Sequence, residues 1–324
     1  MSLPALVAPD SFKGSFDAPA VAAAIARGLR SAGRDAVELP VADGGEGTME
    51  ALAMALGAER RAVTVSDPLG RPVEAEFALL AGGARAVVEA AQASGLGLVD
   101  DDEPDAFAAS SRGTGELIAA ACAAGASTVL VTVGGSATTD GGEGAVEALA
   151  RAGVNPRLEV LCDVRTPWED AASVFGPQKG ADPATVERLE HRLEELAAAA
   201  PRDPRGVPMT GAAGGLSGGL WAHLGARLVP GAPYVLDAIG FDKRMRDAAF
   251  AVTGEGRLDR QTLQGKVVGE VATRCRQAGV ACHAVVGVRE LEPFEGRILD
   301  LSTVVEATTL DELADAGRRL AKTV

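Results

Sequence analysis

The chain has 324 residues, of which 47% are hydrophobic and 23% are charged, and its net charge at pH 7 is −14. This length exceeds the size at which a single core usually stops growing, so two domains are expected, and the composition is typical of a globular protein. The acidic balance argues against nucleic acid as a partner, because a groove that binds a phosphate backbone needs the opposite charge.

The first sixty residues alternate between apolar strands and Ala-rich helices. Strands are predicted at 5–9 and 36–42, and helices at 19–33 and 47–58. An alternation of this kind is typical of a parallel sheet that is covered by helices on both faces.

The pattern changes after residue 60. Three strand-like runs, 60–65, 71–80 and 85–90, follow one another with no helix between them. Pro68 and Gly70 suit a type I turn between the first two runs. Three consecutive strands indicate an antiparallel or mixed sheet, and therefore a second domain. Helices and strands then alternate again, at 113–125, 127–135, 141–153, 157–164 and 182–200.

The C-terminal part returns to regular alternation. Strands are predicted at 248–254, 280–288 and 302–307, separated and followed by helices. Two strands alone make no stable core, so the two ends of the chain are expected to share one sheet. The predicted fold is α/β: a doubly wound parallel sheet formed by residues 1–61 and 231–324, interrupted by an inserted α/β domain with a mixed sheet at 62–230.

One pattern occurs twice: residues 42–52 read ADGGEGTMEAL and residues 139–149 read TDGGEGAVEAL. Each copy follows a strand and opens a helix. A capping box explains part of it, with Asp43 and Asp140 as N-caps and a Glu three residues later. It does not explain the paired glycines, which lower helix propensity by up to about 1 kcal/mol each. Glycines there allow a ligand to approach the backbone amides at the carboxyl end of a strand.

Similar loops follow two further strands. APDSFKG (8–14) and VTGEGRLDRQTLQGK (252–266) each combine carboxylates, hydroxyls, glycines and a lysine, and VGGSATTDGG (133–142) adds hydroxyls to the second copy of the repeat. A solvated loop explains any one lysine, but explains four such loops less well. No Walker A, G-x-G-x-x-G, protein-kinase or G-x-S-x-G motif occurs.

The cysteines and histidines indicate neither a metal site nor an oxidising compartment. The four cysteines show no CxxC spacing and the three histidines are scattered singly, so zinc-ligand spacing is absent. No signal peptide is readable at the N-terminus. The apolar stretch 117–133 is broken by Gly125 and Ser127 into a helix and a strand. We therefore expect a cytoplasmic protein with no membrane partner.

Taken together, the motifs resemble one family closely, the type I glycerate kinases, over nearly the whole chain and in the right order. The motifs that carry the resemblance are APDSFKGS (8–15), PVADGGEGT (40–48), DPLGR (67–71), SRGTGELI (111–118), VGGSATTDGG (133–142), FGPQKGA (175–181), GAAGGLSGGL (211–220), GFD (240–242) and TGEGRLDRQTLQGK (253–266). One departure is the loop after Cys162, where Arg165, Thr166 and Trp168 replace the Asn-Pro-Leu-Gly-type turn that is more usual in the family.

The resemblance implies a flavodoxin-like domain interrupted by a second α/β domain, with ATP-dependent phosphorylation of D-glycerate, usually to 2-phosphoglycerate, and with Mg²⁺. Phosphoryl transfer depends mainly on positioning and on neutralising charge. The catalytic candidates are Lys13, Asp43, Asp140 and Lys266. The candidate metal ligands are Asp43 and Asp140. The substrate-binding candidates are Asp10, Ser11, Arg71, Arg112, Glu255 and Asp259, and the nucleotide-binding candidates are Gly134, Gly135, Ser136 and Thr138.

Several alternatives stay open. Asp43, Asp140 or Glu255 could hold the metal or accept the hydroxyl proton, and Arg71 or Arg112 could bind the glycerate carboxylate by a bidentate pair. Kinase action on another small hydroxy acid, a 3-phosphate product, or a non-catalytic sensor of nucleotide or sugar acid are the rival functions. The oligomeric state is also open, a homodimer included.

Overall fold

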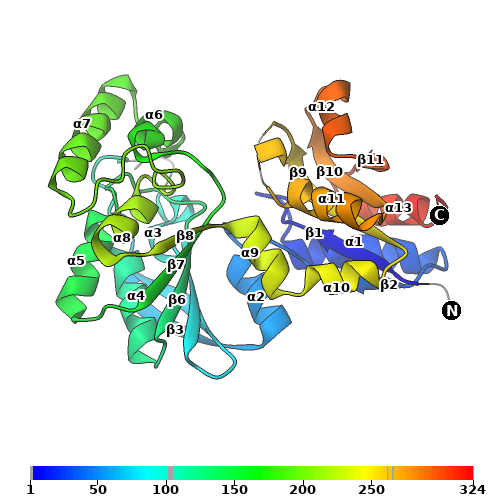
Figure 1. Cartoon of the computed structure of the whole chain (residues 1–324), viewed down its shortest axis with the longest axis horizontal. Coiled ribbons are helices and arrows are strands. Elements are labelled where there is room, and N and C mark those ends of the chain that lie inside the picture. The colour runs from blue at the N-terminus through cyan, green and yellow to red at the C-terminus, as the bar shows by residue number, and fades with distance from the viewer. Residues whose placement is uncertain (1–2, 101–104, 261, 265, 324) are drawn as a thin grey trace. The chain divides into compact units, whose positions relative to one another are not determined.

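The computed structural model describes residues 3–100, 105–260, 262–264 and 266–323. Contacts between Cα atoms divide the chain into two compact units, one formed by residues 1–43 and 232–324 and the other by 44–231 (Figure 1). The sequence had suggested the first boundary at 61/62. The structure assigns 44–61 to the inserted unit, because α2 (Thr48–Leu56) packs against β4 (Pro72–Leu80) and β3 (Ala58–Ser66) pairs with β4 along its whole length.

The first unit has a five-stranded sheet in the order β11-β10-β9-β1-β2, and all of its strands are parallel. The strands are β1 (Ala5–Pro9), β2 (Ala36–Glu38), β9 (Phe250–Leu258), β10 (Cys282–Arg289) and β11 (Thr303–Glu306). Counted within this unit, the order is 2-1-3-4-5, which is that of flavodoxin-like sheets. The expectation that the strands near the two ends of the chain, 5–9 and 249–253, lie in one sheet is confirmed.

Helices α1 (Ala18–Ser31) and α13 (Leu310–Leu320) pack against each other and share a hydrophobic core with β1 and β9. Two glycines make this packing possible. A Cβ on Gly28 would lie 1.9 Å from the carbonyl oxygen of Ala314, and one on Gly317 would lie 2.2 Å from that of Ile25. The remaining helices of this unit are α9 (Gly231–Ala238), α10 (Phe241–Arg246), α11 (Val267–Ala278) and α12 (Pro293–Ile298).

The inserted unit has a mixed six-stranded sheet in chain order, β3 to β8. β3, β4 and β5 (Arg85–Glu89) are antiparallel, as three strands without intervening helices predict, whereas β5 to β8 are parallel. The later strands are β6 (Thr128–Thr132), β7 (Arg157–Cys162) and β8 (Arg227–Pro230). The helices are α2 (Thr48–Leu56), α3 (Ala91–Ser94), α4 (Arg112–Ala123), α5 (Glu143–Ala152), α6 (Ala171–Phe175), α7 (Pro183–Ala199) and α8 (Leu216–Leu224). The α/β fold, with one parallel and one mixed sheet, is confirmed.

Local sequence explains several boundaries. Asp182 caps α7 by accepting from the Thr185 amide at 2.7 Å, with Pro183 at the first helical position. The predicted turn between β3 and β4 is closed by a bond from the Gly70 amide to the Asp67 carbonyl at 3.0 Å. None of the helices in the described parts of the chain combines the length and apolarity needed to cross a bilayer.

The contact between α1 and α13 gives a test of the fold. Gly28→Ala should lower the free energy of unfolding by at least about 1–3 kcal/mol, because the new methyl group meets backbone atoms that cannot rotate away. Gly296→Ala, in α12, is the matched control, since its nearest new neighbour is the flexible Arg289 guanidinium at 3.4 Å. Chemical denaturation followed by circular dichroism measures both. Equal stability of the two variants would contradict the close packing.

Candidate functional site

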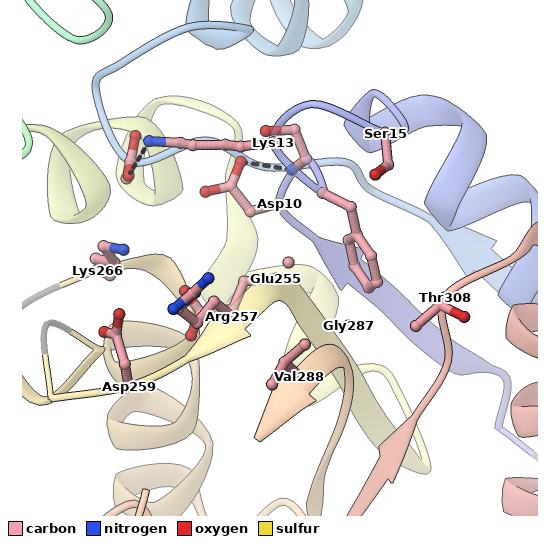
Figure 2. A pocket seen from close by; sticks show the side chains of 14 residues that line it. Asp10, Lys13, Ser15, Glu255, Arg257, Asp259, Lys266, Gly287, Val288 and Thr308 are labelled. Carbon is pink, nitrogen blue, oxygen red and sulfur yellow. Dashed lines mark hydrogen bonds and ion pairs between the residues drawn. The ribbon is translucent and has the colours of Figure 1, made fainter. Parts of the chain in front are cut away.

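The main candidate site is a cavity of about 630 Å³ in the first unit. It lies at the carboxyl ends of β1, β9 and β10, where strand order reverses between β1 and β9, and this is the usual ligand position in open α/β sheets. Figure 2 shows its side chains. The lining residues are Asp10, Ser11, Phe12, Lys13, Ser15, Asp43, Glu255, Gly256, Arg257, Asp259, Lys266, Gly287, Val288 and Thr308. Seven of the residues predicted from sequence are therefore brought together here: Asp10, Ser11, Lys13, Asp43, Glu255, Asp259 and Lys266.

The loop after β1 contributes Asp10, Ser11 and Lys13. The Asp10 amide continues the sheet by donating to the Gly254 carbonyl at 2.8 Å, and the Asp10 carboxylate accepts from the Ser11 amide at 2.7 Å. A backbone bond of 2.8 Å from Phe12 to Phe16 closes the loop, with Lys13 near its tip. The lysine ammonium lies 3.8 Å from Oδ2 of Asp43. The loop after β1 thus places both a carboxyl group, of Asp10, and an ammonium group, of Lys13, in the cavity.

Asp43 is almost fully buried at 3% exposure, although the residue lies in the connection between the two units. The capping prediction is wrong for this residue: α2 begins at Thr48, Gly47 occupies the N-cap with φ of 85°, and no side chain caps it there. The Met49 amide instead donates to Glu89 at 2.8 Å. Asp43 is therefore not needed to start the helix.

Burial and neighbouring carboxylates raise two pKa values in the cavity. Desolvation, followed by the charge of Asp43, raises the pKa of Asp10 well above its usual range. Desolvation is also the main cause that raises the pKa of Glu255 to about 7, against the lowering effects of a hydrogen bond from Thr262 and of the Lys266 charge. The Thr262 hydroxyl donates to Oε1 of Glu255 at 2.6 Å. A carboxyl group with this pKa can exchange a proton near neutral pH.

Arg257 also lines the cavity, and the sequence-based prediction missed it. Glu255, Arg257 and Asp259 are spaced two residues apart along and just beyond β9, and this spacing places side chains on one face of an extended strand. Applying that periodicity to the TGEGRLD motif would have identified the arginine together with the two carboxylates. Ser15 and Thr308 were missed as well, and nothing in their local sequence distinguishes them.

The second DGGEG copy has a different environment, within the inserted unit. Oδ2 of Asp140 accepts from the amide and hydroxyl of Ser111 at 2.7 and 2.8 Å and from the Gly144 amide at 3.3 Å, and Oδ1 accepts from the Gly142 amide at 3.1 Å. Gly142, with φ of 76°, is the N-cap of α5, so Asp140 reaches the first-turn amides from two residues before the cap position. These bonds occupy both oxygens and argue for a structural role.

The glycines of the 134–138 loop are explained largely by packing. A Cβ on Gly134 would lie 2.5 Å from the Gly45 Cα, and one on Gly135 would lie 1.8 Å from Oε1 of Glu46. The Glu46 carboxylate would also repel a phosphate that approached Gly135. The phosphate-binding role of these two glycines stays a prediction.

Lys179, in the FGPQKGA motif, supplies a positive charge to the far side of the same loop. Lys179 is buried, with 4% of the residue exposed. Its ammonium donates to the Ser136 hydroxyl at 3.1 Å and to the Thr138 carbonyl at 2.6 Å. Burial lowers its pKa to about 7. The Thr138 and Thr139 hydroxyls are buried, with no hydrogen-bond partner within the described parts of the chain. The sequence-based prediction passed over this lysine because a single Lys in a Gly-rich loop resembles a solvated one.

Both arginines predicted for the substrate carboxylate lie in the inserted unit and contact carboxylates of that unit. Nε of Arg71 lies 2.6 Å from Oδ2 of Asp67, and Nη2 donates to the Leu98 carbonyl at 3.1 Å. Nε of Arg112 lies 3.0 Å from Oε1 of Glu116. These ion pairs account for the positions of both guanidinium groups.

Magnesium fits the oxygen-rich cavity of the first unit. Among the residues that the structure describes, no group of three or more His, Cys, Asp or Glu side chains is arranged to hold a metal ion. Mg²⁺, however, is usually bound by one or two carboxylates together with substrate phosphates and water. Asp10 and Asp43, which line the same cavity, are a donor pair of that kind.

Comparison with known proteins agrees with this architecture. The model of the glycerate kinase family matches residues 5–157 and 150–322. The glycerate 2-kinase of Escherichia coli is 40% identical, over 98% of this chain and 97% of its own. A glycerate kinase of Halalkalibacterium halodurans is also 40% identical, over 87% of this chain and 84% of its own.

A solved structure extends the comparison to three dimensions. The crystal structure of a putative glycerate kinase 2 from Salmonella typhimurium LT2 covers 100% of this chain and 98% of its own, with a TM-score of 0.82 and 34% identity. The similarity therefore extends over both units. The chain belongs to the glycerate kinase family.

Proposed function

We propose that the protein transfers the γ-phosphate of ATP to a hydroxyl of D-glycerate, giving 2-phosphoglycerate. The observation that carries the proposal is the gathering of Lys13, Lys266 and the carboxylates Asp10, Asp43 and Glu255 around one cavity at the strand-order reversal. Family membership supports the reaction type, and the name of the Escherichia coli relative, glycerate 2-kinase, supports the regiochemistry.

The residues of the cavity supply what this reaction requires. A glycerate hydroxyl oxygen attacks the γ-phosphorus while the bond from that phosphorus to the bridging oxygen of ADP breaks. Glu255 takes the hydroxyl proton, for which a pKa of about 7 is suited. Lys13 and Lys266 neutralise the charge spread over the phosphoryl oxygens. Asp43 and Asp10 would hold Mg²⁺, which when bound neutralises phosphate charge.

The inserted unit has candidate phosphate-binding groups of its own in one loop. Ser136 and Thr138, with the buried Lys179 ammonium beside them, offer hydroxyls and a positive charge to phosphate oxygens. Asp140 fixes the end of the same loop through its bonds to Ser111 and Gly142. We therefore propose that Asp140 stabilises the loop and is not a metal ligand.

Turnover tests the function directly. ADP release, measured by a coupled assay with D-glycerate, L-glycerate and glycerol as acceptors, should be robust with D-glycerate. Phosphorus NMR of the product should show the phosphate on the 2-hydroxyl. Turnover of a sugar without turnover of D-glycerate would assign the protein to another class of kinase, and ligand binding without any turnover would identify a sensor.

The same substitution, Asp to Asn, should affect activity in the first copy of the repeated motif and stability in the second. Asp43→Asn should lower kcat about a hundred- to a thousandfold with little change in melting temperature, because a charge in the site is lost, and Lys13→Ala should do the same. Asp140→Asn should instead destabilise the protein by about 1–3 kcal/mol, because an amide NH₂ would face backbone N–H donors.

Steady-state kinetics and thermal denaturation of the variants separate these effects. Each aspartate variant is the control for the other, since both make the same chemical change in the same sequence pattern. Near-wild-type kcat in Asp43→Asn would remove Asp43 from the chemistry.

The pKa of Glu255 has a consequence for stability. Between the usual glutamate value of 4.5 and about 7, the folded protein keeps a proton that the unfolded chain has released. The free energy of unfolding therefore falls as pH rises through this window. Glu255→Gln removes the titration and can still accept the Thr262 hydroxyl. Relative to wild type, the variant should gain stability from about pH 5 to about pH 8, as measured by urea unfolding at each pH without nucleotide or metal. A difference that does not depend on pH would contradict the raised pKa.

A further inference from the structure

The cavity of the first unit contains one side chain suited to binding a carboxylate in a planar, two-pronged manner. Lys13 and Lys266 each offer a compact ammonium, whereas Arg257 offers a flat guanidinium with several N–H donors in a fixed arrangement. An ammonium group can neutralise a phosphoryl group as a point charge, whereas a carboxylate is bound best by two parallel hydrogen bonds from a guanidinium group. The difference in geometry separates the roles of the three cations.

The position of Arg257 agrees with this role. It follows Glu255 by two residues on β9, so its side chain leaves the strand on the face that lines the cavity, and Figure 2 shows it beside Glu255 and Asp259. Its ion pair with Glu290 joins Nη1 to Oε1 at 2.8 Å, with side-chain exposures of 61% and 45%. Exposed pairs of this kind contribute little to stability, so the guanidinium can accept a second carboxylate.

Charge in the cavity supplies the reason for a dedicated cation. The carboxylates of Asp43 and Asp259 line the same space and would repel an anionic acceptor. Lys13 already lies near Asp43, at 3.8 Å. Lys266 lowers the pKa of Glu255 through its charge. Arg257 is held instead by Glu290, which is outside the set of lining residues.

We propose that Arg257 binds the carboxylate of the acceptor and so selects a hydroxy acid over a neutral polyol. The proposal rests on the proposed function for the identity of the acceptor, D-glycerate. It assigns to one cation of the first unit the task that the sequence suggested for Arg71 or Arg112. Arg257 is thereby a specificity-determining residue, whereas Lys13 and Lys266 bind the transferred phosphoryl group.

The test compares an acceptor that has the carboxylate with one that lacks it. D-glycerate and its neutral amide, D-glyceramide, are titrated by calorimetry into wild type, Arg257→Gln and Arg257→Lys, and kcat/KM is measured for both compounds. Arg257→Gln should weaken D-glycerate binding about 30-fold or more, with D-glyceramide changed by less than about threefold, since truncating one partner of a charged pair acts only on the ligand that carries the other charge. Arg257→Lys should recover only part of the loss, because the fork is missing.

Arg260→Gln is the matched control. Arg260 is an exposed arginine of the same segment, paired with Glu295 at 2.8 Å, and it is not among the lining residues. It should bind both compounds as wild type does. Equal weakening of both compounds by Arg257→Gln, or a rise in KM for ATP with unchanged D-glycerate binding, would overturn the proposal.

The two proposals fail in distinguishable ways. If wild type phosphorylates D-glycerate and Arg257→Gln binds it normally, the role of Arg257 is refuted and the function stands. If wild type binds D-glycerate in a manner that depends on Arg257 but phosphorylates nothing, the carboxylate site stands and the kinase function is refuted. Melting temperatures of all variants identify any loss that arises from unfolding.

Discussion

The parallel pairing of β1 with β9 is the contact on which the candidate site depends. It aligns Pro9 with Gly254, so that the residues following these two positions lie side by side at the edge of the cavity. The next residues along the chain are Asp10 and Glu255. The pKa of Asp10 is raised mainly by burial and by the charge of Asp43, and Glu255 adds a smaller contribution. Gly254 is required there, because a Cβ would lie 2.3 Å from the Val285 carbonyl oxygen on β10. The register of this pair therefore places two carboxyl groups of the site at the same edge of the sheet.

Sequence patterns predicted the architecture well because the physical signals were strong and local. Apolar runs bounded by glycines predicted the strands, and three consecutive strand-like runs with no helix between them predicted the mixed sheet. The boundary at 61/62 was placed too late, because the helix at 48–56 reads like part of the preceding βαβα alternation. Contacts of that helix with β4 and β5, among them the bond from the Met49 amide to Glu89, assign it to the inserted unit.

The site was predicted in part, for a similar reason. Seven charged or hydroxyl residues at strand ends converge as expected, because parallel strands end at one edge of a sheet. The two copies of the repeat were treated alike, and their surroundings then separated them. Asp43 faces a cavity beside Lys13, whereas Asp140 is enclosed by hydroxyl and amide donors that come from Ser111, about thirty residues earlier in the chain. Identical local sequence cannot encode which partners the rest of the chain supplies.

The order of the chain also has a consequence for how the protein is made. The inserted unit, residues 44–231, is continuous, and its ends meet, since a Cβ on Gly44 would lie 2.7 Å from the Gly231 Cα. Its sheet and its hydrophobic core are formed by its own residues, so all of their parts are present once residue 231 has been synthesised. β1 and β2 are synthesised earlier, but the strand that pairs with the other edge of β1 is not available until residue 250. At usual rates of synthesis the nascent half-sheet waits roughly 10 to 40 s for that partner. The unit that contains the cavity is therefore the last to be completed, and until then the unpaired edge of β1 can pair with strands of other chains.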